Sequence, residues 1–378
     1  MKNKKAATEY AFSFHPETMQ RSERKAWLLQ WLREEDEDSL KRLWQAADDT
    51  RRRHVGDAVH LRGIIEISNY CQRSCHYCGI NVQHKGLTRY QMSADEIIEV
   101  AHSIKAYGYG TVVLQSGEHA CIETAWVSDL IRRIKAETAM AVTLSLGERP
   151  VDDYAAWKDA GADRYLLKIE TSDQQLFERI HPPFAQLHWK NRMEILPVLK
   201  EMGYEAGSGI MIGIPGQTYD ILAEDLLTLQ ELDLDMFGLG PYIAHPATPL
   251  YETYHVLKEE RNQVPNSELM TYKVNALARI LCPKVNIPTT TALATLNRET
   301  GRELGLSRGA NVIMPNMTPL HYRRLYEIYP RRVCLEEYGP EMHQKLLQRI
   351  NSLGRTVAAD SGASPHYRER MAGQTVLN

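Results

Sequence analysis

The sequence has little of several features that define other classes of protein. Cysteine is scarce, with 6 in 378 residues, which excludes the dense disulfide framework of small secreted domains. No apolar run approaches the roughly 18 residues that a membrane span needs. The basic start of the chain is not followed by the apolar stretch of a secretory leader. We therefore expect a cytoplasmic protein without a membrane segment.

The chain also lacks a strong charge of either sign. Lysine and arginine total 45 against 48 acidic residues, which gives a net charge of −3. This balance argues against a general affinity for nucleic acid or for anionic lipid. The hydrophobic fraction of 43% is enough for a sizeable core. One large domain or two ordinary ones are expected from the length.

Three of the cysteines stand close together in the chain. Cys71, Cys75 and Cys78 form a C-x3-C-x2-C motif directly after an apolar, strand-like stretch. Three thiolates on one short loop suit three irons of a [4Fe–4S] cluster and leave the fourth iron open for a ligand. Zinc is the alternative, because His76 or His84 could complete a Cys3His site. Structural zinc sites usually pair two cysteine knuckles, however, and the chain has no second C-x2-C.

Apolar strand-like runs alternate with amphipathic helical stretches about eight times, which is typical of parallel βα units. Eight such units fill a (βα)8 TIM barrel of about 250 residues, and residues 57–320 match this length. The predicted strands lie near residues 62–68, 111–116, 140–146, 163–169, 207–213, 235–241, 286–292 and 310–314. The predicted helices lie near residues 93–107, 124–137, 151–160, 172–180, 189–202, 218–232, 266–281 and 298–307.

Helical extensions are expected on both sides of the α/β barrel. Residues 1–56 form the N-terminal extension and residues 321–378 the C-terminal one. The last residues, about fifteen of them, are polar and are expected to form a loose tail. Four apolar side chains at helical spacing would bury one face of the N-terminal extension: Trp27, Leu28, Trp31 and Leu32.

The predicted strands end in unusual polar segments. The second ends at residues 115–118, the third at 145–148 and the fifth at 213–218. Loops commonly contain glycine and proline, but they less readily place acids, arginine and a threonine run directly at strand ends. Function in a TIM barrel gathers at the C-terminal ends of its strands. We therefore expect one cavity at the barrel mouth, facing the three cysteines.

The cysteine motif is the signature of the radical S-adenosylmethionine (radical SAM) enzymes, and the chain resembles them. Further motifs extend the resemblance to the HydE family, the radical SAM maturases of [FeFe]-hydrogenase, across roughly residues 50–335. Methylornithine synthase and biotin synthase share the general plan but match the later segments less well. The segments that carry the resemblance are residues 71–78, 113–118, 143–148, 161–167, 214–218 and 309–316.

The resemblance implies one [4Fe–4S] cluster on the three cysteines and SAM at its open iron. Tyr77 would shield the cluster edge, although simple packing also explains an aromatic residue there. Arg192 would hold the carboxylate of SAM through a bidentate contact. The remaining residues that the resemblance assigns to SAM are Gln115, Ser116, Gly117, Glu118, Ser145, Glu170, Ile212 and Pro241.

The resemblance also implies an anion site deep in the barrel, formed by Arg164, Lys168, Thr290 and Thr291. The family more usually has arginine where Lys168 stands, and lysine offers a point charge without the planar fork. The threonines also suit β-branched filling of a strand. Three further residues could line the cavity or belong to the core: Met236, Tyr322 and Tyr326.

In a HydE-like enzyme, an external one-electron reductant drives cleavage of SAM to a 5′-deoxyadenosyl radical. The substrate would be a small anion, an iron-bound cysteine complex with CO and cyanide, and other hydrogenase maturation proteins would be partners. The alternative is a methylornithine-synthase-like mutase or another radical SAM enzyme with an amino-acid-derived substrate. A non-catalytic cluster carrier or zinc scaffold is a third hypothesis. Many relatives hold a second cluster on a C-terminal cysteine triad, but Cys334 stands alone here and predicts none.

Overall fold

A ring of parallel strands forms the centre of the computed structural model, which describes residues 18–183, 191–257, 261–335, 337 and 339–377. The strand order is β7-β5-β4-β3-β2-β1-β10-β9. A parallel bridge between Met236 and Asn286 brings the two ends of this order together. The predicted TIM barrel is therefore confirmed. Its strands are β1 (Ala58–Ser68), β2 (Thr111–Ser116), β3 (Ala141–Ser145), β4 (Arg164–Leu166), β5 (Glu205–Ser208), β7 (Met236–Phe237), β9 (Pro288–Thr289) and β10 (Val312–Ile313).

Two of the predicted strands are each divided into two short pieces. Beyond β5 and β7, the chain forms β6 (Met211–Ile212) and β8 (Gly240–Pro241), which pair with each other in parallel. The break coincides with a close backbone approach, because a Cβ on Gly209 would lie 2.0 Å from the carbonyl oxygen of Gly238. Only glycine fits at such a contact.

Helices cover the outside of the ring, and the alternating apolar residues of the strands face them. Val112 and Leu114 of β2 and Val142 and Leu144 of β3 belong to the core between the two layers. No helix in the described part of the chain combines the length and apolar character that a membrane crossing needs. The covering helices are α4 (Ala94–Ala106), α5 (Thr124–Thr138), α6 (Val151–Asp159), α7 (Gln174–Ile180), α8 (Arg192–Glu201), α9 (Tyr219–Glu231), α11 (Glu268–Leu281) and α13 (Gly301–Leu306).

The predicted helix over residues 189–202 begins outside the described residues, and two further helices were not predicted. These are α10 (Leu250–Leu257) and α12 (Thr291–Leu296). The predicted strand over 286–292 is therefore too long. Thr290 is the N-cap of α12 and accepts a hydrogen bond from the Leu293 backbone N–H, so its hydroxyl begins a helix where its β-branched shape suggested a strand.

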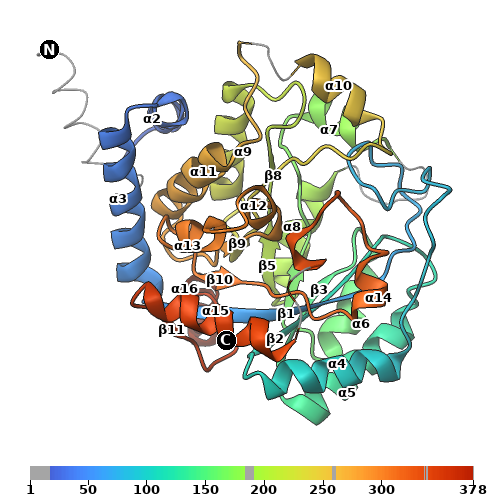
Figure 1. Ribbon diagram of the computed structural model, residues 1–378. Helices are drawn as coiled ribbons and strands as arrows, with labels where there is room; N and C mark the ends of the chain where they lie inside the picture. The colour runs from blue at the N-terminus through green and yellow to red at the C-terminus, as the bar shows by residue number, and fades with distance from the viewer. Residues whose placement is uncertain (1–17, 184–190, 258–260, 336, 338, 378) are drawn as a thin grey trace, which may run out of the picture.

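The N-terminal helices lie outside the barrel against two of its helices (Figure 1). Helix α2 (Arg21–Arg33) packs on α9, and α3 (Glu37–Val55) packs on α11. The four apolar side chains expected to face the protein are all buried in α2. Lys273 of α11 adds a hydrogen bond to the carbonyl of Leu32, 3.0 Å away.

The C-terminal segment begins with α14 (Leu320–Arg323) beside the barrel, and its later part returns to the amino end of β1, where it pairs with the sheet (Figure 1). The segment also contains a 3-10 helix (Val333–Leu335), α15 (Pro340–Ser352), β11 (Thr356–Val357), which pairs with the start of β1, and α16 (Pro365–Leu377). Helix α16 occupies the segment for which the sequence predicts a loose tail. His366 lies 2.8 Å from carboxylates of both Asp233 and Asp235, and these contacts order a polar segment that has no apolar periodicity.

Candidate active site

The cysteine loop follows β1, and hydrogen bonds to neighbouring segments hold its backbone. Gln72 N donates to Glu118 O at 2.8 Å, and His76 N donates to Ile180 O at 2.8 Å. Arg89 donates to three carbonyl oxygens around the loop, at 2.6 to 2.7 Å. The loop is therefore held in place by residues outside the motif, although it contains no helix or strand.

The donor chemistry of this loop fits an iron–sulfur cluster. Cys75 is buried, and Cys71 and Cys78 are half-buried. Burial raises the pKa of all three thiols, that of Cys78 to about 12, so the thiolates need a cationic partner such as iron. Among the described residues, no three His, Cys, Asp or Glu side chains gather around one point to hold a single ion. A cluster presents a separate iron to each sulfur, which does not require that convergence.

Gly117 brings the end of β2 into contact with the cysteine loop. A Cβ at this position would lie 2.3 Å from Tyr70 O and 2.9 Å from Cys71 Cβ. A similar approach occurs at the end of β3, where a Cβ on Gly147 would lie 2.4 Å from a carboxylate oxygen of Glu118. The predicted SAM-binding segment 116–118 therefore lies directly against the cysteine loop.

A buried network joins the loop to the ends of β2 and β3. Arg73, inside the cysteine motif, donates to Glu118 at 3.1 Å. Glu118 also accepts the backbone N–H of Glu148 at 3.0 Å. Arg192, at the start of α8, donates through Nε to Glu148 at 2.8 Å and through Nη1 to the carbonyl of Lys168 at 2.7 Å. The network places Arg192 at the barrel mouth, where the carboxylate of SAM was predicted.

His181 links the two arginines of this network and was not predicted. Its Nδ1 lies 2.9 Å from Arg73 and its Nε2 lies 2.7 Å from Arg192. Burial and the two guanidinium groups lower the pKa of His181 well below its usual value, so the imidazole is neutral. Sequence reasoning also missed Arg73 and Glu148. Arg73 had one available signal, since it is a charged residue within the cysteine motif.

Glu170 lies just beyond β4 in a strained backbone conformation. Its φ is 63°, a left-handed value that costs a non-glycine residue about 1–3 kcal/mol and is often found at functional sites. The carboxylate lies 2.9 Å from Lys168 Nζ, and the Tyr77 hydroxyl donates to it at 3.4 Å. The structure thus brings Lys168, predicted for the anion site, together with Tyr77 and Glu170, predicted for SAM.

Lys168 and Thr290 lie on the inner face of the barrel beside a row of glycines. A Cβ on Gly238 would be 4.0 Å from Lys168 Cδ, and one on Gly240 would be 3.2 Å from Thr290 Oγ1. Both side chains are half-buried. The absence of a side chain at Gly240 allows Thr290 to lie close to the backbone there. Thr291 is the first residue of α12 and is also half-buried.

Gln115 and Ser145 end β2 and β3 side by side, as register partners in the sheet. Gln115 also donates to the hydroxyl of Tyr326 at 3.3 Å, so the C-terminal segment reaches the barrel mouth. Ile212 and Pro241 are register partners in the β6–β8 pair, and both are buried. The structure therefore places these four predicted SAM residues as two pairs of neighbours near the strand ends.

Arg164 does not lie where it was predicted. It is the first residue of β4 and thus sits at the amino end of the strand, about 13 Å below Lys168 at the usual rise per residue. There it is buried, forms an ion pair with Glu205 and donates to Ser361 O at 2.8 Å. Arg164 therefore belongs to the floor of the barrel. Met236 is also core, 4% exposed, with its sulfur near the guanidinium of Arg62.

Tyr322 also lies away from the barrel interior. Its hydroxyl donates to Glu96 at 2.9 Å, next to the start of α4, and its ring stacks on Tyr90. Of the two expectations for Tyr322, the structure favours packing against the core over lining the cavity. The interior contact from this segment that was missed is a buried ion pair between Arg332 and Glu66 of β1. In the sequence, the only indication of this ion pair is that an acidic residue, Glu66, stands within the apolar run of β1.

Comparison with known proteins shows the family to which the chain belongs. The radical SAM superfamily model matches residues 65–229. The [FeFe] hydrogenase maturase subunit HydE of Thermotoga maritima is 46% identical over 320 residues, 85% of this chain and 88% of that protein. The 3-methylornithine synthase of Methanosarcina acetivorans is 27% identical over 281 residues, 74% of this chain and 75% of that protein.

Two solved structures share the fold. Methylornithine synthase PylB superposes with a TM-score of 0.76 at 22% identity and covers 91% of this chain and 96% of its own. HydG, a maturase of the [FeFe]-hydrogenase, superposes with a TM-score of 0.73 at 17% identity and covers 98% of this chain and 83% of its own. At these identities the two structures support the architecture alone.

The barrel, its three-cysteine loop and the family match define a radical SAM enzyme, which binds a [4Fe–4S] cluster and SAM. Within this class, the alignment at 46% identity over 85% of the chain shows the particular family. The chain belongs to the HydE family.

Proposed function

We propose that this enzyme acts in assembly of the diiron subcluster of [FeFe]-hydrogenase. The observation that carries the proposal is the 46% identity to the HydE maturase across 85% of the chain. Hydrogenase maturation proteins would be its partners, and an external reductant would supply its electrons. We place this activity in the cytoplasm, because an open cluster needs a reducing environment.

In this proposal the three cysteines hold the cluster, and the ends of β2, β3 and β4 hold SAM. When bound, the cluster supplies the electron that cleaves SAM to methionine and a 5′-deoxyadenosyl radical. Arg192 orients the carboxylate of SAM, and the backbone at 116–118 receives its amino group. Glu170, Tyr77 and the other predicted SAM residues lie around the same mouth. Their packed surroundings exclude water and stray hydrogen donors from the radical.

The substrate in this proposal is a small anion, an iron-bound cysteine complex with CO and cyanide. Lys168 and Thr290, which flank the inner-face glycines, would contact it, with Thr291 at the start of α12. Arg164 takes no part, since it lies at the barrel floor. Lys168 gives this chain a point charge where its relatives more usually place a planar arginine.

The cluster assignment has a direct test. Cys75→Ala should abolish reductive cleavage of SAM by the anaerobically reconstituted enzyme. Cys121→Ala is the matched control, because Cys121 is exposed and lies outside the loop, and it should retain cleavage. Full cleavage by the Cys75 variant would remove the cluster from this loop.

A second candidate is a mutase of the methylornithine synthase type, favoured by the 27% identity to 3-methylornithine synthase. A mutase that regenerates SAM within its cycle accumulates little 5′-deoxyadenosine, whereas a maturase that consumes SAM releases it in stoichiometric amounts. Quantifying 5′-deoxyadenosine per turnover with each substrate class separates the two functions.

We also propose that the enzyme carries one cluster. Cys334 is 1% exposed and contacts the Asn316 side-chain amide, 3.9 Å from its sulfur. No cysteine follows it in the chain. Iron analysis of the reconstituted protein should therefore give about four irons per chain. A stable content near eight would contradict the single cluster.

A further inference from the structure

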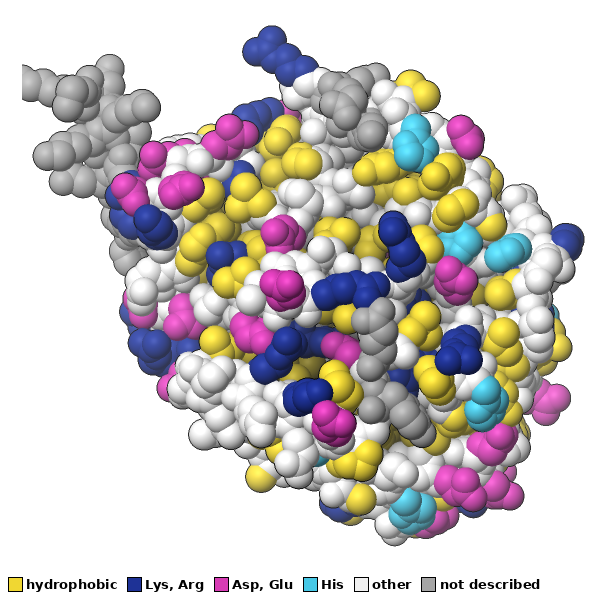
Figure 2. Space-filling view, in the orientation of Figure 1, with side chains coloured by type: hydrophobic (Ala, Val, Ile, Leu, Met, Phe, Trp, Pro, Cys, Tyr) yellow, Lys and Arg dark blue, Asp and Glu magenta, His cyan; other side chains and the backbone are white. Residues whose placement is uncertain are grey.

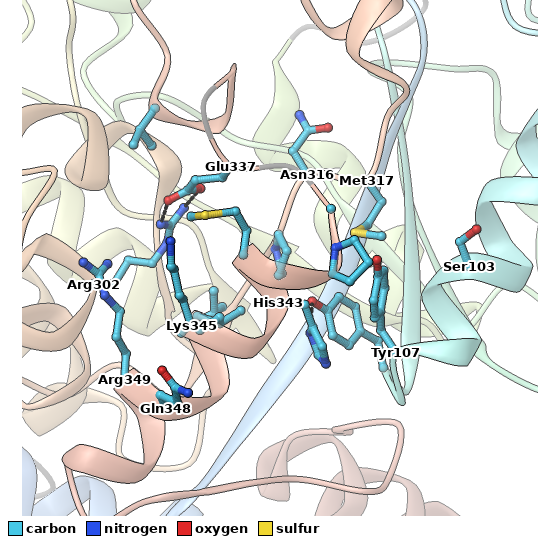
Figure 3. Close-up of a pocket in the computed structure, with 18 of the residues that line it drawn as sticks. Ser103, Tyr107, Arg302, Asn316, Met317, Glu337, His343, Lys345, Gln348 and Arg349 are labelled. Atoms are coloured by element: carbon cyan, nitrogen blue, oxygen red, sulfur yellow. Dashed lines mark hydrogen bonds and ion pairs between the residues drawn. The ribbon is translucent and has the colours of Figure 1, made fainter.

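A cavity of about 680 Å³ lies outside the barrel and plays no part in the proposed function. Its walls come from α4, the segment leading to β2, the end of β10 with the loop that follows, α13 and α15 (Figure 3). The loop wall continues the ring beside β1, because Ile64 of β1 bonds to Pro315 and Met317 at 2.9 and 2.8 Å. Val100 and Ser103 of the covering helix α4 also line the cavity. The cavity is thus separated from the cysteine loop by the strand ring.

One side of this outer cavity is aromatic and apolar. The His343 ring lies 4.6 Å from the Tyr107 ring and 5.4 Å from the Tyr109 ring, measured between centroids. The Tyr109 hydroxyl is 3.0 Å from His343 Nδ1. Burial lowers the pKa of His343, which favours a neutral ring beside the two tyrosines. Met317 and Leu346 also line the cavity, and its aromatic side is suited to the flat apolar part of a ligand.

The other side is cationic. Among the described residues, five lysine or arginine side chains and one acid, Glu337, line the cavity, although the chain as a whole has a net charge of −3. Figure 3 shows Arg302, Lys345 and Arg349 on the side opposite Tyr107. Figure 2 shows that basic side chains on this face of the molecule are interspersed with acidic ones.

Two of these cations can accept a new partner at low cost. Lys345 pairs with Glu341 at 2.8 Å, with side chains 55% and 82% exposed. Arg349 pairs with Glu303 at 3.1 Å and is itself 44% exposed. Exposed ion pairs contribute little to stability, so an anion in the cavity can compete for Lys345. Arg349 is held more firmly, because Glu303 is only 18% exposed and Arg349 also donates to Glu299 O at 3.1 Å, but its half-exposed guanidinium can share its donors with an anion. Arg302 is less available to a ligand, because both of its terminal nitrogens donate to the Glu337 carboxylate. This ion pair forms part of the cavity wall.

We propose that this outer cavity binds a small organic anion with an aromatic or similarly flat apolar body. Its acidic group would meet Lys345 and Arg349, and its apolar body would lie on Tyr107 and His343. The volume lies within the range of about 300–1,000 Å³ found for small-molecule sites, which favours a compact ligand over a protein segment.

The probe is 8-anilinonaphthalene-1-sulfonate, which combines a sulfonate with an aromatic body. Calorimetric titration of the reconstituted enzyme, saturated with SAM to occupy the barrel, gives its affinity and stoichiometry. N-phenyl-1-naphthylamine has the same rings without the sulfonate. We expect the sulfonate to bind at one site per chain and the uncharged compound to bind at least about tenfold more weakly.

Substitutions in the cavity wall test whether the sulfonate probe binds there. Lys345→Gln with Arg349→Gln should weaken sulfonate binding about tenfold or more, and Leu346→Trp should weaken it by filling the cavity. Lys41→Gln with Arg132→Gln is the control, since it removes the same charge from exposed pairs elsewhere. Each variant should still cleave SAM, which shows that it folds. Equal affinity in the double variant and the control, or equal binding of the two probes, would overturn the proposal.

Discussion

At the residue scale, the buried network around Arg192 is the least expected feature of the site. Resemblance to relatives predicted Arg192, but its partners Glu148 and His181 are 44 and 11 residues away in the chain. Periodicity and spacing do not reveal such pairings, because they depend on how the strand ends meet. The network also means that a substitution at Arg192 changes stability as well as binding.

Arg192→Gln should weaken SAM binding about 10- to 100-fold, because a charge-assisted contact to the SAM carboxylate is lost. It should also lower the free energy of unfolding by roughly 3 kcal/mol, since Glu148 loses a buried partner. Titration calorimetry and urea denaturation measure the two effects. Arg149→Gln is the control, because it breaks a nearby pair with Asp153 at 2.7 Å that lies outside the predicted SAM site. Equal SAM affinity in both variants would remove Arg192 from that site.

Gly117 allows a second test at a single residue. Gly117→Ala would force a Cβ to within 2.3 Å of Tyr70 O and 2.9 Å of Cys71 Cβ, so the loop must shift. We expect the iron content after anaerobic reconstitution to fall by at least about half, as the three sulfurs lose their spacing. Gly86→Ala serves as the control, because a Cβ there meets nothing within 4 Å. Full iron loading of both variants would show that this contact does not position the cluster.

At the scale of elements, the alternation of strands and helices was predictable because each inner strand carries its own apolar pattern. The residues at which individual helices and strands begin and end were harder to predict. Thr290 and Thr291 continue the β-branched run of a strand, yet Thr290 caps α12. Helix α16 shows the reverse problem, since it lacks an apolar stripe and depends on residues near position 235. A local pattern cannot reveal either a cap that competes with a strand or a helix held by distant charges.

The contacts of α16 make its stability depend on pH. Hydrogen bonds to Asp233 and Asp235 raise the pKa of His366 from 6.5 to about 9. A pKa that is higher in the folded state stabilises the protein fully below pH 6.5, and this contribution is lost as the pH rises through 9. The upper limit is about 3 kcal/mol. Between pH 6 and 9.5, the wild-type protein should therefore lose more stability than His366→Gln, as followed by urea denaturation. Parallel losses in both proteins would contradict this role.

At the scale of the whole molecule, the barrel was predictable from the repeated alternation of strands and helices. The contacts on the barrel floor, at the amino ends of the strands, were not predictable in this way. Arg62 of β1 and Arg164 of β4 are both buried, and Arg164 forms an ion pair with Glu205. Burial and the neighbouring Arg164 lower the pKa of Arg62 to about 9. The C-terminal segment supplies hydrogen-bond acceptors to both guanidinium groups, because Gly362 O accepts from Arg62 at 2.9 Å and Ser361 O accepts from Arg164 at 2.8 Å. These partners lie 300 and 197 residues apart in the chain, far beyond the reach of any local pattern.

The floor segment should thus matter more to folding than the helix that follows it. A chain ending at Ser364 keeps Ser361, Gly362 and the bond from Ser364 N to Glu205, 2.9 Å long. It should fold and take up iron, with a lower melting temperature. A chain ending at Gly354 leaves the two arginines and Glu205 without these partners, each costing about 1–3 kcal/mol. Circular dichroism melting and iron analysis of both truncations test whether residues 355–364 matter more to folding than helix α16. Similar melting temperatures for the two chains would show that residues 355–364 do not support the barrel, and that its buried charges are satisfied within the strand ring.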